Sequence, residues 1–477
     1  MSINLHINAS LAVALAGGAS ANFGTARFLA EHSISANRSD GPYSSIAEVE
    51  AAGFTAAAQA DVHGWASAVF AQNPRTASVL VGRRLPGEHV ATAMSAIEAA
   101  YPAQAYVTNM ASNTPNDIMA LAAWTETRAK IAVAQSSDAA LAAGTASTQQ
   151  VSNFTIGAAA TDGVYSIAVT NAWTGAAIGT ASFTASSDDD DAIAAGLRSA
   201  WDAVAALAAV SEAAAGASEV VAITFDGLGN GYDFALTSPG DILTVATPAF
   251  VQNVLQLGSA LGYNQTAVVY HDDDTEYLDG AWCGRCLGFA LESPQGNGSW
   301  AYHKLVGVTA TSQTSAAKTA ILASNGNFYA PVTYTSGVEE SGFTWEGIML
   351  SGRFIDIQVT LDLTQARIEE AILQAFLRAA STNRPGIGFD DDGIGLLAGA
   401  ALSVLDRLVR ARHYRAGALS SLTQRRTPYV DAPAVSSLSP AQRSGRIVTL
   451  TSEAVFGGFI HSVGDPATVG ITLDLSF

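Results

Sequence analysis

Two cysteines three positions apart have the spacing of a reactive thiol pair. Cys283 and Cys286, in the run Cys-Gly-Arg-Cys, are the only cysteines of the chain. In thioredoxin-like enzymes such a pair lies at a helix N-terminus, which lowers the pKa of one thiol. Here the pair follows Trp282 inside a segment, 278–291, whose pattern predicts a helix. Three interpretations stay open: buried structural thiols, a disulfide within or between subunits, and a redox site. A zinc site would need two further ligands at comparable spacing, and the sequence offers none.

Three runs of aspartate could bind a hard cation, because such ions take several oxygen ligands. They are Asp188–Asp191, Asp272–Asp274 and Asp390–Asp392. None of them is completed by the glutamate that ends a calcium-binding loop. The first and third runs come just before predicted helices, where negative charge is favourable by about 0.3–1 kcal/mol. We therefore predict charged helix N-termini and no metal site.

The other residue types with catalytic potential do not form a known site. The Gly-rich segment 227–231 lacks the lysine and the following helix of a phosphate loop. We predict instead that it is a hairpin turn between strands 220–225 and 232–236. The eight histidines are scattered singly, and no nucleophile, base and orienting acid occur together in a recognised motif. We predict no catalytic residues, no cofactor, and a protein that is not an enzyme.

The chain is strongly acidic overall but basic in one segment. Its net charge of −19 argues against general binding of nucleic acid, which needs a basic surface. Between residues 403 and 446, eight arginines stand against two aspartates; the arginines are Arg407, Arg410, Arg412, Arg415, Arg425, Arg426, Arg443 and Arg446. A solvated helix face is one interpretation. The other is a docking surface for an acidic partner or for an acidic face of another copy.

Both ends of the chain alternate apolar and polar residues, with the period of a β-strand that has one buried face. The apolar positions are Ile3, Leu5 and Ile7 at the start and Ile471, Leu473, Leu475 and Phe477 at the end. Chain ends usually fray unless something holds them. We therefore expect both strands to dock in a sheet, either the chain's own or, by strand donation, that of a neighbour. Residues 11–21 are apolar, but no Lys or Arg precedes them, so we predict no signal peptide. No run of 18 apolar residues occurs, so we predict no membrane span.

The pattern of elements predicts an α/β and α+β protein of several domains. The boundaries that we predict are an N-terminal arm (1–20), an α/β domain in two parts (21–145 and 246–335), an α+β insertion between those parts (146–245), a C-terminal α+β core domain (336–460) and a C-terminal arm (461–477). The elements that matter below are strands at 23–30, 77–82, 266–270 and 344–349 and helices at 54–72, 114–134, 363–380 and 394–412.

Several short motifs, taken in order, resemble those of the tail-sheath proteins of contractile-tailed bacteriophages. In the second half they are Ser324–Tyr329, Glu346-Gly347 and Ser351–Asp356, followed by Arg384-Pro385 and Asp392–Ile394. In the first half they are Tyr43–Ser45 with Phe54, and Ala68–Arg75, within which Phe70–Pro74 is similar to the family's Phe-x-Gln-x-Pro turn. The motifs lie on both flanks of 146–245, and that segment is the part least covered by the resemblance.

The resemblance implies an architectural protein of a phage tail. Sheath proteins form hexameric rings that stack helically around the tail tube, and their contraction drives the tube through the host envelope. It implies a core domain completed by both chain termini and facing the tube, a middle α/β domain, an outward β-rich insertion, and arms that link neighbouring subunits. The implied partners are other copies, the tail tube protein, and baseplate and tail terminator proteins, with assembly in the bacterial cytoplasm and no membrane insertion.

In this interpretation Arg407, Arg410, Arg412 and Arg415 are the tube-facing residues, on a predicted helix that begins near Ile394. The alternatives are a thiol–disulfide oxidoreductase and a self-assembling surface-layer or shell protein.

Overall fold

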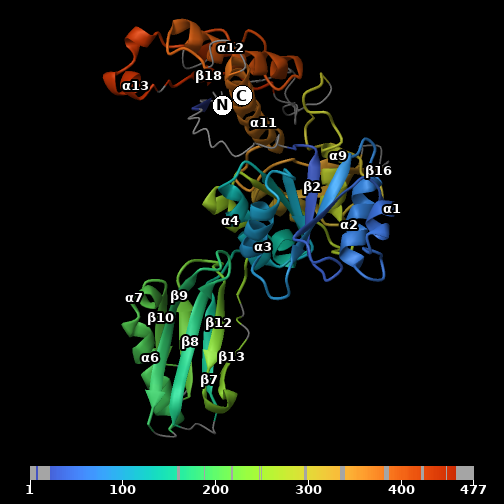
Figure 1. Cartoon of the computed structure of the whole chain (residues 1–477). Helices are drawn as coiled ribbons and strands as arrows, with labels where there is room; N and C mark the ends of the chain where they lie inside the picture. Colours follow the sequence, from blue (N-terminus) through green and yellow to red (C-terminus); the bar gives the residue numbers. More distant parts are fainter. Residues whose placement is uncertain are drawn as a thin grey trace, which may run out of the picture.

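The structure is a computed structural model of the 477-residue chain. It describes residues 7–8, 22–157, 162–186, 189–215, 219–246, 248, 250–294, 298–333, 339–380, 386–419, 424–446 and 448–457. These residues form a mixed α/β fold with several sheets, arranged as three lobes (Figure 1). A central body carries the largest sheet, a β-rich lobe projects from one end of it, and a mainly helical C-terminal lobe lies at the other end.

The central sheet has eight strands, of which the six inner ones are parallel and the two edge strands antiparallel. In their order across the sheet they are β16 (Glu339–Trp345), β15 (Asn327–Thr333), β14 (Thr266–Tyr270), β6 (Ile131–Ser136), β5 (Val107–Met110), β2 (Thr25–Glu31), β4 (Ser78–Arg84) and β3 (Ser39–Tyr43). The chain adds β4 on one side of β2 and then β5, β6 and β14 on the other, which is the winding of a doubly wound sheet. The inner strands are nearly continuous apolar runs because helices cover both faces.

Each face of the central sheet has its own hydrophobic core. One core is covered by α1 (Ile46–Ala51), α2 (Ala60–Phe70) and α9 (Leu278–Cys286). The other is covered by α3 (Val90–Ala100), α4 (Pro115–Glu126), α5 (Ala139–Ala143), α8 (Val254–Leu261) and α10 (Ser315–Ala323). The first core continues into the C-terminal lobe, so the central body and that lobe share apolar packing.

The β-rich lobe, residues 151–245, is called the β lobe below. It has one antiparallel sheet of β10 (Ser211–Ala215), β11 (Val220–Phe225), β7 (Val151–Ile156) and β13 (Leu243–Val245), and a second of β12 (Tyr232–Thr237), β8 (Gly163–Asn171) and β9 (Ala177–Ala185). Helices α6 (Asp190–Ala203) and α7 (Ala205–Ala208) close the space between the two sheets, around a core of its own. The lobe leaves the central sheet after β6 and returns before β14, and these two strands pair directly.

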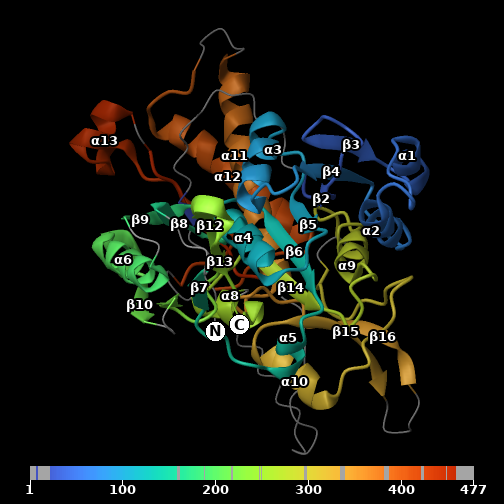
Figure 2. The same ribbon diagram turned by 90° about the horizontal axis from the view of Figure 1, so that it is seen from below.

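The C-terminal lobe is built on two long antiparallel-running helices, α11 (Ile355–Ala380) and α12 (Asp391–Arg410). A short sheet of β1 (Ile7–Asn8), β18 (Thr451–Glu453) and β17 (Tyr429–Asp431), the turn η2 (Val435–Ser437) and helix α13 (Pro440–Gly445) complete it. The first half of α11 is buried against the central body, and α12 packs on its second half. Helix α11 therefore connects the two lobes (Figures 1 and 2).

Most of the expected elements are confirmed. The strands expected at 23–30, 77–82 and 266–270 are β2, β4 and β14, and the helix expected at 394–412 is α12. The helix that carries both cysteines is α9.

Other predictions are wrong. The helix expected over 114–134 ends at Glu126, and its last part is the strand β6, which is buried on both faces. The helix expected from Phe54 begins only at Ala60, and the helix expected from Leu363 already begins at Ile355. The strand expected at 344–349 is β16, which ends at Trp345.

The predicted hairpin of 220–225 and 232–236 is also wrong. Strand β11 pairs with β10 and β7, whereas β12 pairs with β8 in the other sheet of the β lobe. The Gly-rich segment between them is thus a connection between two sheets, and the pairing partners lie much earlier in the chain.

Candidate functional site

The start of β15 and the stretch that leads from the end of β16 into α11 form a largely buried joint, which we define as residues 324–329 and 346–356. Asn327 is its centre and is fully buried. Its Nδ2 donates to the carbonyl oxygens of Val268 (3.0 Å) and Ile348 (2.8 Å), and its Oδ1 accepts from the amides of Gly347 (3.0 Å) and Ile348 (2.9 Å). One side chain thereby ties β14, β15 and the approach to α11 together, and it uses its full hydrogen-bonding capacity.

Two residues of the joint adopt backbone conformations that set the direction of α11. Gly347 has φ +83°, and a Cβ there would lie 2.9 Å from the backbone nitrogen of Ala301, so only glycine fits. Its carbonyl accepts from the amide of Ile355 (2.9 Å), the first residue of α11. Asn325 has φ +60° and donates to the carbonyl of Leu350 (2.8 Å). The motifs noted in the sequence at 324–329, 346–347 and 351–356 thus coincide with the residues that position α11.

Helix α11 brings two carboxyl groups into the interior. Asp362 Oδ2 accepts from the hydroxyl of Tyr106 (2.7 Å), and its Oδ1 accepts from Nε2 of Gln358 (3.0 Å). Burial raises the pKa of Asp362 to about 6, partly offset by these hydrogen bonds. Asp356 is also buried, and burial raises its pKa to about 6. Asp362 was not identified from the sequence. The one feature that could have indicated a buried carboxyl group is its position as a charged residue among the apolar residues of the helix.

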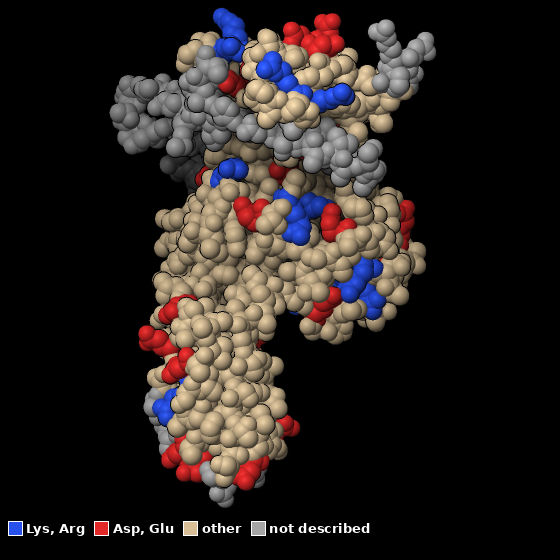
Figure 3. Space-filling view, turned by 60° about the vertical axis from the view of Figure 1, so that its left-hand side comes forward, with Lys and Arg blue, Asp and Glu red and all other residues tan. Residues whose placement is uncertain are grey.

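The eight arginines of residues 403–446 are all exposed, and we call them the arginine surface. The apolar side of α12, which includes Val404, Leu405 and Leu408, packs inward, so the arginines at its end point to solvent. Arg407 Nη2 lies 3.2 Å from a carboxylate oxygen of Glu292, and Arg425 Nη1 lies 3.6 Å from one of Asp431. Figure 3 shows basic and acidic side chains on the C-terminal lobe and mainly acidic ones on the β lobe.

The structure separates the predicted site residues into three groups. Arg407 and Arg410 lie on the last turn of α12, and Arg412 and Arg415 follow it. Ile7 lies in β1, opposite Ser452 of β18 in the same chain. The other arm residues, Ile3, Leu5, Ile471, Leu473, Leu475 and Phe477, lie outside the described residues. Exchange of arms between copies stays a prediction.

The cysteine pair lies in the core between α9 and α2. Cys283 and Cys286 are free and buried. Burial raises the pKa of both thiols well above the usual range. Gly284, between them, packs so closely on α2 that a Cβ would lie 2.6 Å from the carbonyl oxygen of Val69. This environment disfavours the thiolate that redox chemistry requires, and it favours the interpretation as structural thiols.

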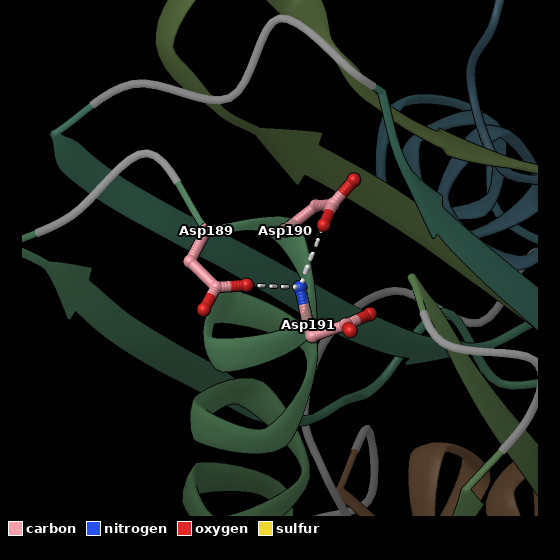
Figure 4. A group of neighbouring side chains, drawn as sticks. All are labelled: Asp189, Asp190 and Asp191. Carbon is pink, nitrogen blue, oxygen red and sulfur yellow. Dashed lines mark hydrogen bonds between the residues drawn. The ribbon is translucent and has the colours of Figure 1, made fainter.

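The aspartate runs before α6 and α12 act as helix caps, as predicted. Figure 4 shows Asp189 and Asp190 around the first turn of α6. Oδ1 of Asp189 accepts from the amides of Asp191 (3.1 Å) and Ala192 (3.3 Å). Asp390 caps α12 in the same way through the amide of Gly393 (2.8 Å). One carboxylate oxygen from each of Asp189, Asp190 and Asp191 lies within 4.8 Å of the others, and bonds to backbone amides of the first turn hold the carboxylates of Asp189 and Asp190.

The β lobe contacts the carboxyl edge of the central sheet after β4 and β5, part of the edge where doubly wound folds usually bind ligands. Asn116, at the start of α4, accepts from Nε1 of Trp173 (3.3 Å) and from Nε2 of Gln252 (2.6 Å). The backbone of Gly231 lies so close to Asn116 that a Cβ there would be 2.1 Å from its Oδ1. Nε2 of His89, at the start of α3, lies 2.8 Å from the carbonyl oxygen of Ala172. Residues of the β lobe therefore fill the space next to the starts of α3 and α4.

In comparisons with known proteins, no family model matches this sequence, and no curated protein shows significant similarity to it. Among the described residues, no helix combines the length and the apolar character needed to cross a membrane.

Proposed function

We propose that the chain is a tail-sheath protein of a contractile bacteriophage, an architectural subunit that polymerises around a tail tube. The observation that carries the proposal is the arginine surface, exposed on one lobe of a chain whose net charge is −19. The sheath-like motifs around Asn327 support it, because they build the joint that orients this lobe. The protein would be found in the virion tail, after assembly in the bacterial cytoplasm.

In this proposal the C-terminal lobe is the core domain that faces the tube, the central body is the middle domain, and the β lobe projects outward. Arg407, Arg410, Arg412 and Arg415 would dock on an acidic surface of the tube, since opposite potentials steer and orient binding. Copies would form hexameric rings through donated terminal strands, with a neighbour's strand taking the place beside β18 that the chain's own β1 occupies here. Baseplate and tail terminator proteins would close the ends of the stack.

Contraction would be a passage from an extended lattice to a more tightly packed one, without nucleotide. Burial of apolar surface stabilises by about 25 cal/mol per Å². A few hundred Å² of additional contact per subunit would therefore release several kcal/mol, multiplied over many copies. Helix α11 would transmit the movement, because its first half is fixed in the central core and its second half carries the C-terminal lobe.

Negative-stain electron microscopy of the purified full chain tests the proposal. We expect hollow tubes of stacked rings, and tubes filled by the tail tube protein when that protein is added. Flat lattices would instead support a surface-layer or shell protein. Dispersed monomers at every concentration and salt, with or without tube protein, would contradict the proposal.

Truncation tests the arms separately. Removal of residues 1–10 or 471–477 should leave a folded monomer, by circular dichroism, that no longer polymerises. Ordinary tubes from either truncated chain would refute arm exchange. The oxidoreductase alternative predicts a reactive thiol, whereas the burial of Cys283 and Cys286 predicts slow alkylation of the native chain and a single monomer band on non-reducing electrophoresis.

A further inference from the structure

The β lobe carries about half of the net negative charge of the molecule, −10 of −19, since 11 acidic residues stand against 1 basic residue, Arg198, between residues 151 and 245. Two such lobes repel one another if their carboxylates come close. Any contact between them therefore has to exclude the acidic side chains.

The outer face of the three-stranded sheet is almost free of charge. Its middle row is Ala235, Ala168 and Thr180, which are directly opposed across β12, β8 and β9. The next row of outward side chains, farther from the central body, is Thr237, Ser166 and Ser182. The row after that is Val164 and Thr184. Asp233, at the end of β12 nearest the central body, is the only charged residue of this face.

The outer face of the four-stranded sheet has the same character. Ala214, Ala222 and Asn153 form its middle row across β10, β11 and β7. Thr224 with Val151 and Val220 with Thr155 lie on either side. Glu212, on the edge strand β10, is the only charged residue among the outward positions of the four strands.

The remaining acidic residues lie in loops or on α6, so they surround these faces. Among the described residues they are Asp162, Asp189–Asp191, Asp202, Glu219 and Asp226, together with Asp241 in the short turn η1 (Pro239–Asp241). Figure 3 shows this segregation from one side: the Asp and Glu side chains gather at an edge and at the tip of the lobe and leave a broad uncharged area. An uncharged centre with a charged rim is the anatomy of a contact surface.

The two uncharged faces point away from each other. The inner side chains of both sheets meet in one core, where the rings of Phe154 on β7 and Phe234 on β12 lie 4.9 Å apart. Figure 2, which looks along the lobe, shows the two sheets as opposite layers with α6 beside them. A copy can therefore offer one face to each of two neighbours.

We propose that β lobes of neighbouring copies pack side by side, with the β12-β8-β9 face of one copy against the β10-β11-β7-β13 face of the next. The charge pattern points to another copy as the partner. A basic partner would be met by acidic residues on the face. A second β lobe is itself acidic, so it can pack here only if the face carries no acidic residues.

In such a contact each copy uses one face for one neighbour and keeps its other face for the next. Copies can therefore be added repeatedly, which gives a ring or a helical array. Small side chains let the sheets approach to the usual 10 Å of sheet packing.

The contact is weak on its own. Three strands about 4.8 Å apart and about 20 Å long present about 300 Å², well below the area of a stable dimer interface. It acts where other contacts already hold the copies together. The proposal needs lateral association of copies but does not depend on the tail-sheath function.

Disulfide trapping in the full-length chain tests the contact, because both native cysteines are buried and an added thiol is the accessible one. The double variant Ala168→Cys/Ala222→Cys places one thiol at the centre of each face. Under mild oxidation of the concentrated protein we expect a ladder of crosslinked oligomers from the double variant and only monomer from each single variant. Salt screens the repulsion between the acidic rims of two lobes. The yield of crosslinked oligomers should therefore be about threefold higher at high salt than at low salt.

The control is Ala168→Cys/Ser199→Cys, whose second thiol lies on the exposed side of α6. An equal ladder from this control, efficient dimers from a single variant, or no ladder from Ala168→Cys/Ala222→Cys would each overturn the proposal. The two proposals fail separately. Tubes without a ladder would refute the lobe contact, and a ladder without tubes would refute the tail-sheath function and leave the lobe contact standing.

Discussion

The joint and the arginine surface both gather polar residues near α11 and α12, but they use them in opposite ways. In the joint, the hydrogen-bonding groups of Asn327 are buried and all are paired inside the chain. On the arginine surface, Arg407 and Arg410 are exposed. Substitutions in the joint should therefore change folding, and substitutions on the arginine surface should change binding.

The largest effect is expected for Asn327→Ala. The substitution leaves the amides of Gly347 and Ile348, and the carbonyl oxygens of Val268 and Ile348, without the side chain they bond to in a buried site. Each unsatisfied buried group costs about 1–3 kcal/mol, so with four groups affected we expect a loss of at least about 4 kcal/mol of unfolding free energy. Urea denaturation followed by circular dichroism measures it.

Asn153→Ala, on the exposed face of β7, is the matched control and should change stability by less than about 0.5 kcal/mol. Equal denaturation midpoints for the two variants would show that the joint does not hold the fold together.

A smaller, pH-dependent effect is expected for Asp362→Asn. Burial raises the pKa of Asp362 to about 6, above its value in the unfolded chain. The folded state therefore binds a proton between about pH 4 and 6 that the unfolded state has released, and this contribution to stability is lost as the pH rises through that window. Asparagine cannot ionise, so the variant should gain stability relative to the natural chain from pH 4 to 7, by up to about 3 kcal/mol.

Denaturation of both chains at pH 4, 5, 6 and 7 checks the sign of this difference. Asp406→Asn, which removes an exposed carboxylate of α12, is the control. If the Asp362→Asn variant instead loses stability relative to the natural chain as the pH rises, the fold stabilises the ionised form of Asp362.

The sequence predicted the elements of this molecule where the pattern is local. The inner strands of the central sheet are apolar runs, and the cap before α12 is a short-range signal. It misassigned β6 because an apolar run flanked by a helix has no periodicity that separates strand from helix. Both β11 and β12 have the alternating pattern of strands, so their existence was predicted. Their pairing was misassigned because the partners β7 and β8 lie far back in the chain, and a local pattern does not encode such pairing.

The same distinction applies to the candidate site. The arginines were visible as a cluster because they are close in sequence and exposed. The environment of Asp362 was not, because Tyr106, which donates to it, is 256 residues away. Polar residues that act at a surface are thus easier to recognise in this chain than polar residues that act inside it.

The smallest effect on stability is expected for Arg407→Glu. Arg407 is about half exposed and its ion pair with Glu292 is solvated, so its loss should cost at most about 1 kcal/mol. If the arginine surface docks on an acidic tube, the same substitution, strengthened by Arg410→Glu and Arg412→Glu, should abolish decoration of the tube while the chain stays folded. Sedimentation of the chain with tube protein, at low and high salt, measures this loss.

Arg198→Glu is the control, because it makes the same change of charge on the β lobe at the other end of the molecule. The loss of decoration is compared per unit of charge changed. If Arg198→Glu causes as large a loss on this scale as Arg407→Glu/Arg410→Glu/Arg412→Glu, the effect comes from total charge and not from the arginine surface. If the triple variant still decorates the tube fully, the tube-facing assignment is wrong, and the arginines are a solvated face. A triple variant that unfolds would place these residues with Asn327, and the contrast between the two regions would disappear.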